Sequence, residues 1–207
     1  MASMILLPLL LLATAPPPAW AAIDVVQMLA DKPKYAMFAK LLDQSRVAAE
    51  VNRLRSVSLL VVPDRFVQPL MALPADKQRA ALANHVLMEY SDPVRLGEIK
   101  SRTAVLRTLL SLADKRNGAI VYNQSADGQM YLNAPGNPCV GKLVKVIAAR
   151  PVAVCIMEVS ELLLPAGYST APCAKKGDYK AKGKLKTLAA NEGSMRAAPS
   201  QAPPSTR

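Results

Sequence analysis

Three apolar segments, at 57–62, 85–90 and 152–164, dominate the hydrophobic pattern of this chain. The first is rich in β-branched and aliphatic residues, which is typical of a buried strand. The first segment ends at Pro63-Asp64, and the second stops at a turn signal, Ser91-Asp92-Pro93. The pattern therefore predicts that the three segments are strands of one core.

Apolar residues at helical spacing predict short amphipathic helices before and between the first two strands. Asp24 is suited to cap the first helix, because an aspartate side chain can accept a hydrogen bond from the first helical turn. The last of these helices runs directly into the second strand at His85, the only histidine of the chain. The predicted helices cover 25–29, 35–42, 44–54, 66–71 and 76–86.

A β-hairpin is predicted where strands at 119–123 and 129–132 flank the tight-turn signal Asp127-Gly128. Asn117-Gly118 gives a second tight-turn signal just before this hairpin. A further long apolar strand is predicted at 140–148. Helices and strands in this order are typical of an α+β domain.

The composition fits one domain with an aliphatic core, because 51% of the 207 residues are hydrophobic and only 4% are aromatic. Residues 1–22 read as a cleavable signal peptide, with an apolar run at 4–13, three prolines and then Ala19-Trp20-Ala21. A membrane anchor is the alternative, but the apolar run is shorter than the ~20 residues that a span requires.

The C-terminal part, 168–207, differs from the rest in charge and composition. It contains eight Lys or Arg residues and two acidic residues, and so carries +6 of the net charge of +11. This composition predicts a disordered basic tail. No transmembrane helix is expected after the leader, and no GPI anchor is expected because the C-terminus lacks an apolar tail.

Three cysteines, Cys139, Cys155 and Cys173, are present. In an oxidising compartment two of them can pair and one is left over, and the sequence does not choose the pair. None has the spacing of metal ligands, and a single histidine makes a zinc site hard to build. Neither a metal nor another cofactor is expected.

The order of these elements resembles the fasciclin (FAS1) domain, and most closely the domain of plant fasciclin-like arabinogalactan proteins. The segment 56–64, ending in Pro-Asp, resembles the first block of that family. His85-Val86-Leu87-Met88-Glu89-Tyr90 resembles its central histidine motif, and 152–165 resembles its last block.

The resemblance covers about 23–167 and implies a β-sandwich-like wedge of about seven strands with packed helices. It implies that Asp64, His85 and Tyr90 belong to a structural motif. It also implies a secreted, non-catalytic glycoprotein that acts in cell adhesion in the cell wall or extracellular matrix. Its partners would be cell-wall polysaccharide or matrix and cell-surface proteins, and no nucleic acid is expected.

His85 is the only candidate for acid–base chemistry near neutral pH. We expect it to be a structural histidine that bonds a backbone carbonyl at the turn from helix to strand. The alternative is a secreted hydrolase that uses His85 with Cys139 or a serine, although the chain has no Gly-x-Ser-x-Gly motif.

Asn123-Gln124-Ser125 is a sequon for N-glycosylation, predicted at the turn of the hairpin. Near the C-terminus, Pro199, Pro203 and Pro204 stand in Ala-Pro and Pro-Ser contexts. By the family resemblance, these prolines are candidate attachment sites for arabinogalactan.

A cationic run in the tail offers a different function, the binding of an acidic polysaccharide through release of counterions. If the protein is extracellular, a pectin-like polymer fits this run better than nucleic acid does. The residues of the run are Lys175, Lys176, Lys180, Lys182, Lys184 and Lys186.

Overall fold

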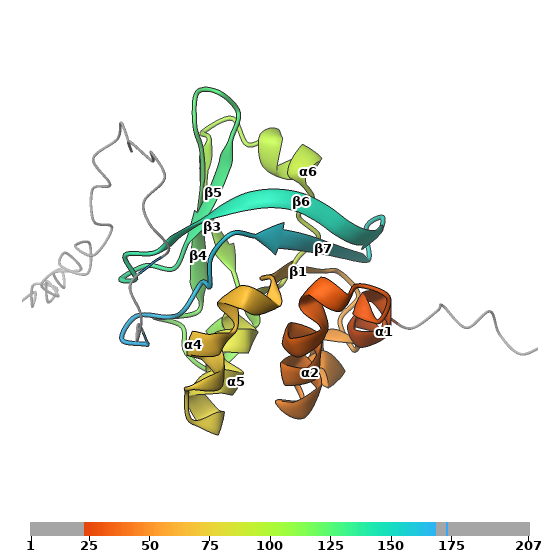
Figure 1. The fold of residues 1–207 in the computed structure, drawn as a ribbon. Coiled ribbons are helices and arrows are strands. Elements are labelled where there is room, and N and C mark those ends of the chain that lie inside the picture. The colour runs from red at the N-terminus through yellow and green to blue at the C-terminus, as the bar shows by residue number, and fades with distance from the viewer. Residues whose placement is uncertain (1–22, 169–172, 174–207) are drawn as a thin grey trace, which may run out of the picture. The chain divides into compact units, whose positions relative to one another are not determined.

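A computed structural model of the protein (Figure 1) describes residues 23–168 and Cys173. The predicted signal peptide, the candidate prolines and the cationic run of the tail lie outside the described residues. No helix of the described part is long and apolar enough to cross a bilayer.

Seven strands form one mixed sheet in the order β2-β1-β7-β6-β5-β4-β3. The three apolar segments become β1, β2 and β7, which lie side by side, so the prediction that they share one core is confirmed. β1 pairs with β7 in parallel and with β2 antiparallel. The strands are β1 Val57–Val61, β2 Val86–Leu87, β3 Thr103–Arg107, β4 Ala119–Gln124, β5 Met130–Asn133, β6 Val140–Arg150 and β7 Val154–Val159.

The sheet bends back on itself because its longest strand, β6, serves both halves. The first residues of β6 pair with β5, and the residues from Leu143 onward pair with β7 across two irregularities of register. An isolated bridge between Leu87 and Thr108 then joins the two ends of the strand order. The result is a nearly closed wedge of seven strands with helices packed on it, which confirms the predicted α+β fold class.

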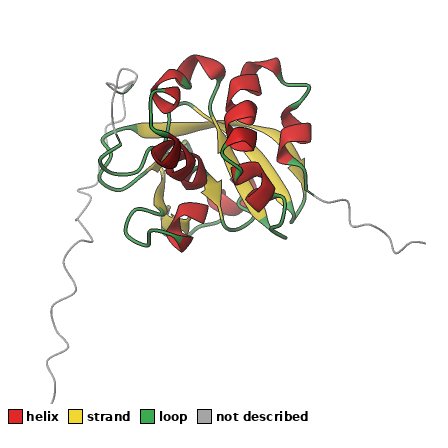
Figure 2. Ribbon diagram, turned by 90° about the horizontal axis from the view of Figure 1, so that it is seen from below, coloured by secondary structure: helices red, strands yellow, loops and turns green. Residues whose placement is uncertain are grey.

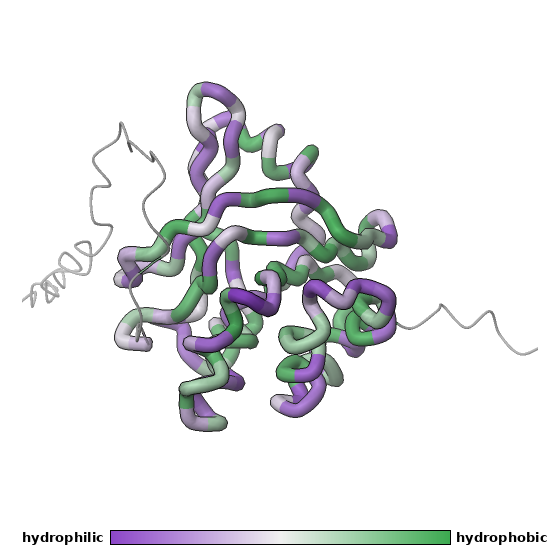
Figure 3. Tube along the Cα trace, viewed as in Figure 1, coloured by the Kyte–Doolittle hydropathy of each residue, from purple (hydrophilic) through white to green (hydrophobic). Residues whose placement is uncertain are grey.

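Several of the helices lie together on one side of β1 and β7, as Figure 1 and the turned view in Figure 2 show. Every residue of β1 and β7 is buried, because the helices cover one face and the rest of the sheet covers the other. The hydropathy along the trace agrees, since these strands are largely apolar while the helices alternate (Figure 3). The helices are α1 Val25–Leu29, α2 Ala36–Gln44, α3 Val47–Val51, α4 Gln68–Met71, α5 Ala75–Asn84 and α6 Pro93–Gly97, with 3-10 turns η1 Pro33–Tyr35, η2 Asp64–Phe66 and η3 Leu109–Leu112.

The predicted helix at 44–54 was wrong in its first part. Arg46 adopts the left-handed conformation with φ of 62°, and this separates α2 from a shorter α3. Asp24 caps α1 as expected, accepting a hydrogen bond from the Gln27 amide at 3.0 Å. The local pattern therefore predicted the apolar faces of the helices but missed the turn at Arg46.

The strand predicted at 85–90 is only two residues long, because side chains replace the ladder after Leu87. The hydroxyl of Ser56 accepts a hydrogen bond from the Tyr90 amide at 3.0 Å, and that of Ser58 accepts one from the Ser91 amide at 2.7 Å. These two hydrogen bonds hold residues 90–91 beside β1, although they do not form a strand there.

The hairpin of β4 and β5 is confirmed, with Gly128 at a φ of 84° in its turn. The turn at Asn117-Gly118 connects η3 to β4 and is not a hairpin turn. Gly118 does not have a positive φ, so turn conformation does not explain why a glycine is present. A Cβ atom at Gly118 would lie 2.1 Å from the backbone nitrogen of Ser111. Close backbone approach, rather than turn conformation, therefore demands this glycine.

The turn between β6 and β7 holds a strained residue. The Ala153 amide donates to the Arg150 carbonyl at 3.0 Å, and Val152 between them has a φ of 67°. A β-branched residue rarely adopts this conformation, whereas glycine does so freely. Val152→Gly is therefore expected to stabilise the domain by about 1 kcal/mol.

Urea denaturation followed by circular dichroism measures this gain. The matched control is Val105→Gly on β3, where a comparably exposed valine lies in a regularly paired strand and glycine weakens the strand. A lower midpoint for Val152→Gly than for the wild type would show that the turn is not strained.

Candidate functional site

The side chains of Asn84 and His85 clamp one residue of the segment that follows β7. The Leu163 amide donates to His85 Nε2 at 3.0 Å, and Asn84 Nδ2 donates to the Leu163 carbonyl at 2.7 Å. On its other side, His85 Nδ1 lies 2.8 Å from the carbonyl oxygen of Leu60 in β1. Both residues are fully buried, so the helix end, β1 and the segment after β7 meet at this clamp.

These contacts assign the proton of His85. A carbonyl can only accept, so Nδ1 carries the hydrogen, and Nε2 accepts from the Leu163 amide as in a neutral ring. Burial lowers the pKa of His85 to about 4, although the hydrogen bond with Leu60 acts in the opposite direction. The ring therefore stays neutral at physiological pH and has no nitrogen left for a substrate.

Asp64 lies on η2 and caps a helix from outside that helix. Its Oδ1 accepts hydrogen bonds from the amides of Met37 at 3.0 Å and Phe38 at 3.3 Å. These amides belong to the first turn of α2, which has no capping side chain of its own. A carboxylate is favourable there because it satisfies amides that lack helical partners and lies at the positive end of the helix dipole.

Tyr90 is buried beside the bend that follows β2. Burial first, and then Asp92, raises the pKa of Tyr90 above its ordinary value, and the Arg95 guanidinium stands 5.4 Å from the ring centroid. The structure thus places Asp64, His85 and Tyr90 around β1, but it does not bring them together as one reacting group.

The cysteines divide into a pair and a buried thiol. Cys139 and Cys173 form a disulfide, and Cys155 in β7 is fully buried. Burial raises the pKa of the Cys155 thiol to about 11, so the thiolate is scarce at neutral pH. The hydrolase alternative therefore has neither a free Cys139 nor an accessible His85.

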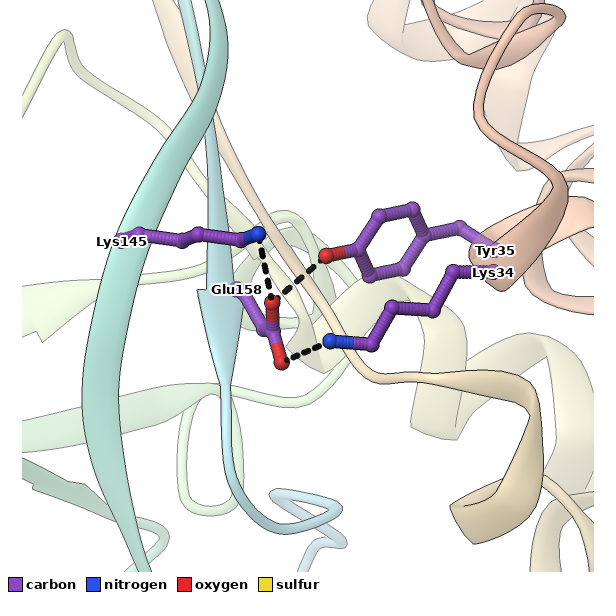
Figure 4. Close-up of polar contacts among 4 residues, drawn as sticks. All are labelled: Lys34, Tyr35, Lys145 and Glu158. Carbon is purple, nitrogen blue, oxygen red and sulfur yellow. Dashed lines mark hydrogen bonds and ion pairs between the residues drawn. The ribbon is translucent and has the colours of Figure 1, made fainter.

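A second polar centre, which the sequence did not reveal, surrounds Glu158 of β7 (Figure 4). Its carboxylate accepts hydrogen bonds from Lys34 Nζ at 2.8 Å and from the Tyr35 hydroxyl at 2.6 Å. Nζ of Lys145, in β6, lies 3.8 Å from Oε2 of the same carboxylate. The carboxylate is almost completely buried while both ammonium groups reach solvent.

The charge state of this centre follows from its contacts. Burial acts to raise the pKa of Glu158, but the bonds from Lys34 and Tyr35 and the two lysine charges outweigh it, so the pKa lies below its ordinary value. The same burial, with Glu158 beside it, raises the pKa of Tyr35. The centre therefore holds a stable carboxylate that ties η1 to the sheet.

Removing the acceptor in this centre is expected to cost stability in a graded way. Glu158→Leu leaves the buried Tyr35 hydroxyl without a partner and should cost about 3 kcal/mol. Glu158→Gln keeps an acceptor and should cost about 1 kcal/mol, because both lysines can turn to water. Urea unfolding measures both losses.

Tyr35→Phe supplies the control, since it removes the donor and leaves no orphaned hydroxyl. In a double-mutant cycle, Glu158→Leu should cost less in the Tyr35→Phe background than in the wild type. Simple addition of the two losses would show that the two groups do not interact.

Asn123 lies within β4, two residues before the hairpin turn rather than in it. Its side chain is half-buried and accepts a hydrogen bond from the Thr103 hydroxyl at 3.1 Å. Glycosylation of Asn123 stays a prediction, as do the roles of the tail lysines and prolines.

A shallow groove of about 350 Å³ opens between the β4–β5 turn, the start of α6 and β6. It combines opposite charges, Asp127 and Lys145, with apolar side chains such as Met130 and Val144. None of Asp64, His85 and Tyr90 is among the residues that line it, so it is separate from the buried clamp.

Comparison with known proteins agrees with this fold. No protein-family model matches the chain. The chain is 25% identical over 155 residues to fasciclin-like arabinogalactan protein 10 of Arabidopsis thaliana, a match that covers 72% of this chain and 37% of the relative. Protein 8 of the same series is 26% identical with the same coverage, and protein 4 is 27% identical over 156 residues, 71% of this chain and 37% of the relative.

The chain thus spans 37% of the length of these curated relatives. Among solved structures it is similar to a FAS1 domain pair from the insect cell adhesion molecule fasciclin I, with a TM-score of 0.51 and 12% identity. That match covers 63% of this chain and 45% of the insect protein. The chain therefore has a FAS1 fold, and its sequence resembles those of the plant fasciclin-like arabinogalactan proteins.

Proposed function

We propose that this protein is secreted and acts in the cell wall or extracellular matrix as a non-catalytic adhesion glycoprotein. Its FAS1 domain would bind polysaccharide or the surface of another matrix protein. The observation that carries the proposal is that the fold uses its candidate catalytic groups internally. Both ring nitrogens of His85 bind backbone, and Cys139 is in a disulfide.

Four further features support an extracellular location. The disulfide is of a kind that persists in oxidising compartments. The sequence begins with a predicted signal peptide and contains one sequon, at Asn123. Curated relatives are named fasciclin-like arabinogalactan proteins, and a structural relative is described as a cell adhesion molecule.

The test is to express the full chain in plant cell culture, measure the intact mass of the product and map peptides that carry Asn123 and 199–204. We expect that the leader is cleaved and that these sites carry glycan. We also expect that protein recovered from the culture medium is retained on cell-wall fragments. Protein that stays inside the cell would refute secretion. Secreted protein that passes over wall fragments unbound would refute adhesion.

A second candidate is binding of acidic polysaccharide through the basic tail, which is favoured by its share of the net charge, +6 of +11. Truncation after Ala174 removes the cationic run but keeps Cys173 and its disulfide. The truncated protein should elute from a pectin column at a much lower salt concentration than the full chain. Equal elution would refute a role for the tail.

A further inference from the structure

The outer face of β3, β4 and β5 is partly exposed to solvent. Strand pairing puts the inward residues of these strands, such as Ile120, Tyr122 and Leu132, into the core, where they are fully buried. The outward residues are half-buried or exposed, and Val105 is 58% exposed. Part of the apolar surface of this face, Val105 above all, therefore meets solvent.

Two cross-strand rows make up this face. One row runs from Thr103 through Asn123 and Tyr131 to Lys142. The neighbouring row is largely apolar and consists of Val105, Val121, Asn133 and Val140. The only sequon of the chain therefore lies in the middle of the face, beside an aromatic residue and next to a row of valines.

Asn123 is oriented by its neighbour on β3. The Thr103 hydroxyl donates to Asn123 Oδ1 at 3.1 Å, and no described residue forms a hydrogen bond with Nδ2. Nδ2 is the atom that would carry an N-glycan. Because Oδ1 and Nδ2 diverge from the same carbon, Nδ2 faces away from the Thr103 hydroxyl, and the next strand on that side of β4 is β5.

Tyr131 is the residue on that side. The Ser125 amide donates to the Gln129 carbonyl at 2.9 Å, and since such pairs alternate, Asn123 and Tyr131 are also a hydrogen-bonded pair. Side chains directly opposite in such a pair stand about 5.5 Å apart on the same face. The first sugar on Asn123 would therefore begin within reach of the Tyr131 ring.

We propose that the first sugar of an N-glycan on Asn123 packs on the ring of Tyr131 and covers part of the valine row, so that the glycan is a stabilising part of the fold. The inference rests on the proposed function, which requires secretion and glycosylation. A pyranose ring has an apolar face of C–H groups and a polar rim, which matches an aromatic ring with a polar tip. The glycan would then cover apolar surface of this face that meets solvent, such as that of Val105.

The experiment compares three forms of the same full chain: fully glycosylated, trimmed enzymatically to a single sugar, and unglycosylated from bacteria. Asn123 is the only sequon, so every N-glycan effect comes from this site. Mass spectrometry verifies the disulfide and the occupancy of Asn123 in each form. We expect the first two forms to have a folded-to-unfolded ratio about two- to tenfold higher than the third in urea.

Variants of Tyr131 separate the ring from the hydroxyl. Tyr131→Phe keeps the ring and should retain the gain from the glycan, whereas Tyr131→Thr keeps strand propensity without the ring and should lose it. The gain is measured within each variant, so any effect of the substitution on the bare protein cancels.

The outcomes distinguish this inference from the proposed function. An occupied Asn123 with no gain, or with an equal gain in Tyr131→Thr, would overturn the packing while leaving a secreted glycoprotein intact. An unoccupied Asn123 in secreted protein would overturn the packing and the N-glycan together. A gain that needs the whole glycan and is absent with one sugar would also overturn it.

Discussion

Gly118→Ala is expected to cost about 4 kcal/mol or more and to leave little folded domain at room temperature. An added Cβ would lie 2.1 Å from the nitrogen and 2.2 Å from the Cα of Ser111, and both are backbone atoms that cannot rotate away. Separating the two segments would move Thr108, whose amide donates to the Gly118 carbonyl and which bridges to Leu87. The strain therefore reaches the bridge that joins the two ends of the sheet.

Gly97→Ala in α6 is the matched control. The nearest heavy atom to its added Cβ is the terminal methyl of Met130 at 3.5 Å, which is an ordinary contact with a flexible side chain. Its stability should stay within about 0.5 kcal/mol of the wild type. Circular dichroism and urea unfolding of the two variants decide the matter, and a stable Gly118→Ala would show that η3 and β4 are not in close contact.

Replacing His85 should have the second large effect. His85→Ala leaves the Leu60 carbonyl and the Leu163 amide buried without partners and opens a cavity, at a cost of about 4 kcal/mol. His85→Gln can restore part of the bonding and should cost about 2 kcal/mol. Urea unfolding at pH 7.5 measures both.

The same residue gives stability a pH dependence. The folded pKa of His85 is about 4 and the unfolded value is 6.5, so between these values the unfolded chain binds a proton that the folded protein does not. Stability should therefore be complete above pH 6.5 and fall by about 3 kcal/mol as the pH drops to 4.

His85→Gln should lack this dependence between pH 6.5 and 5, where Glu158, whose folded pKa lies below 4.5, stays ionised in both proteins. Parallel pH curves for the wild type and the variant would contradict a buried neutral histidine. Loss of a measurable activity in a stable His85→Gln protein would instead revive the hydrolase alternative.

The sequence predicted the parts of the fold that local pattern determines. The β-branched and aliphatic residues of β1 indicated a buried strand, the long apolar segment around β7 indicated another strand, and Asp127-Gly128 placed the hairpin. Boundaries failed where tertiary contacts decide them. Ser56 and Ser58 end β2 early by taking over its hydrogen bonds, and nothing in the local pattern of 85–90 announces this.

The polar centres were harder to predict because their members are far apart in sequence. Tyr35 and Glu158 are separated by 123 residues, and neither lies in a motif with recognisable spacing. Asn84 stands next to the singled-out histidine, yet its contact with Leu163 depends on where the chain passes after β7. A buried glutamate in an otherwise apolar strand was the one available sign, because such a charge requires partners.

The disulfide has a mechanical consequence when the chain is placed under tension. It closes a covalent loop of 34 residues in sequence separation, from Cys139 to Cys173, and β6 and β7 lie inside that loop. Tension applied between the start of the domain and the tail passes through the sulfur atoms and bypasses both strands. Forced extension would therefore release a chain about 120 Å shorter than the same sequence with reduced cysteines, and the two strands at the centre of the sheet would never be pulled straight.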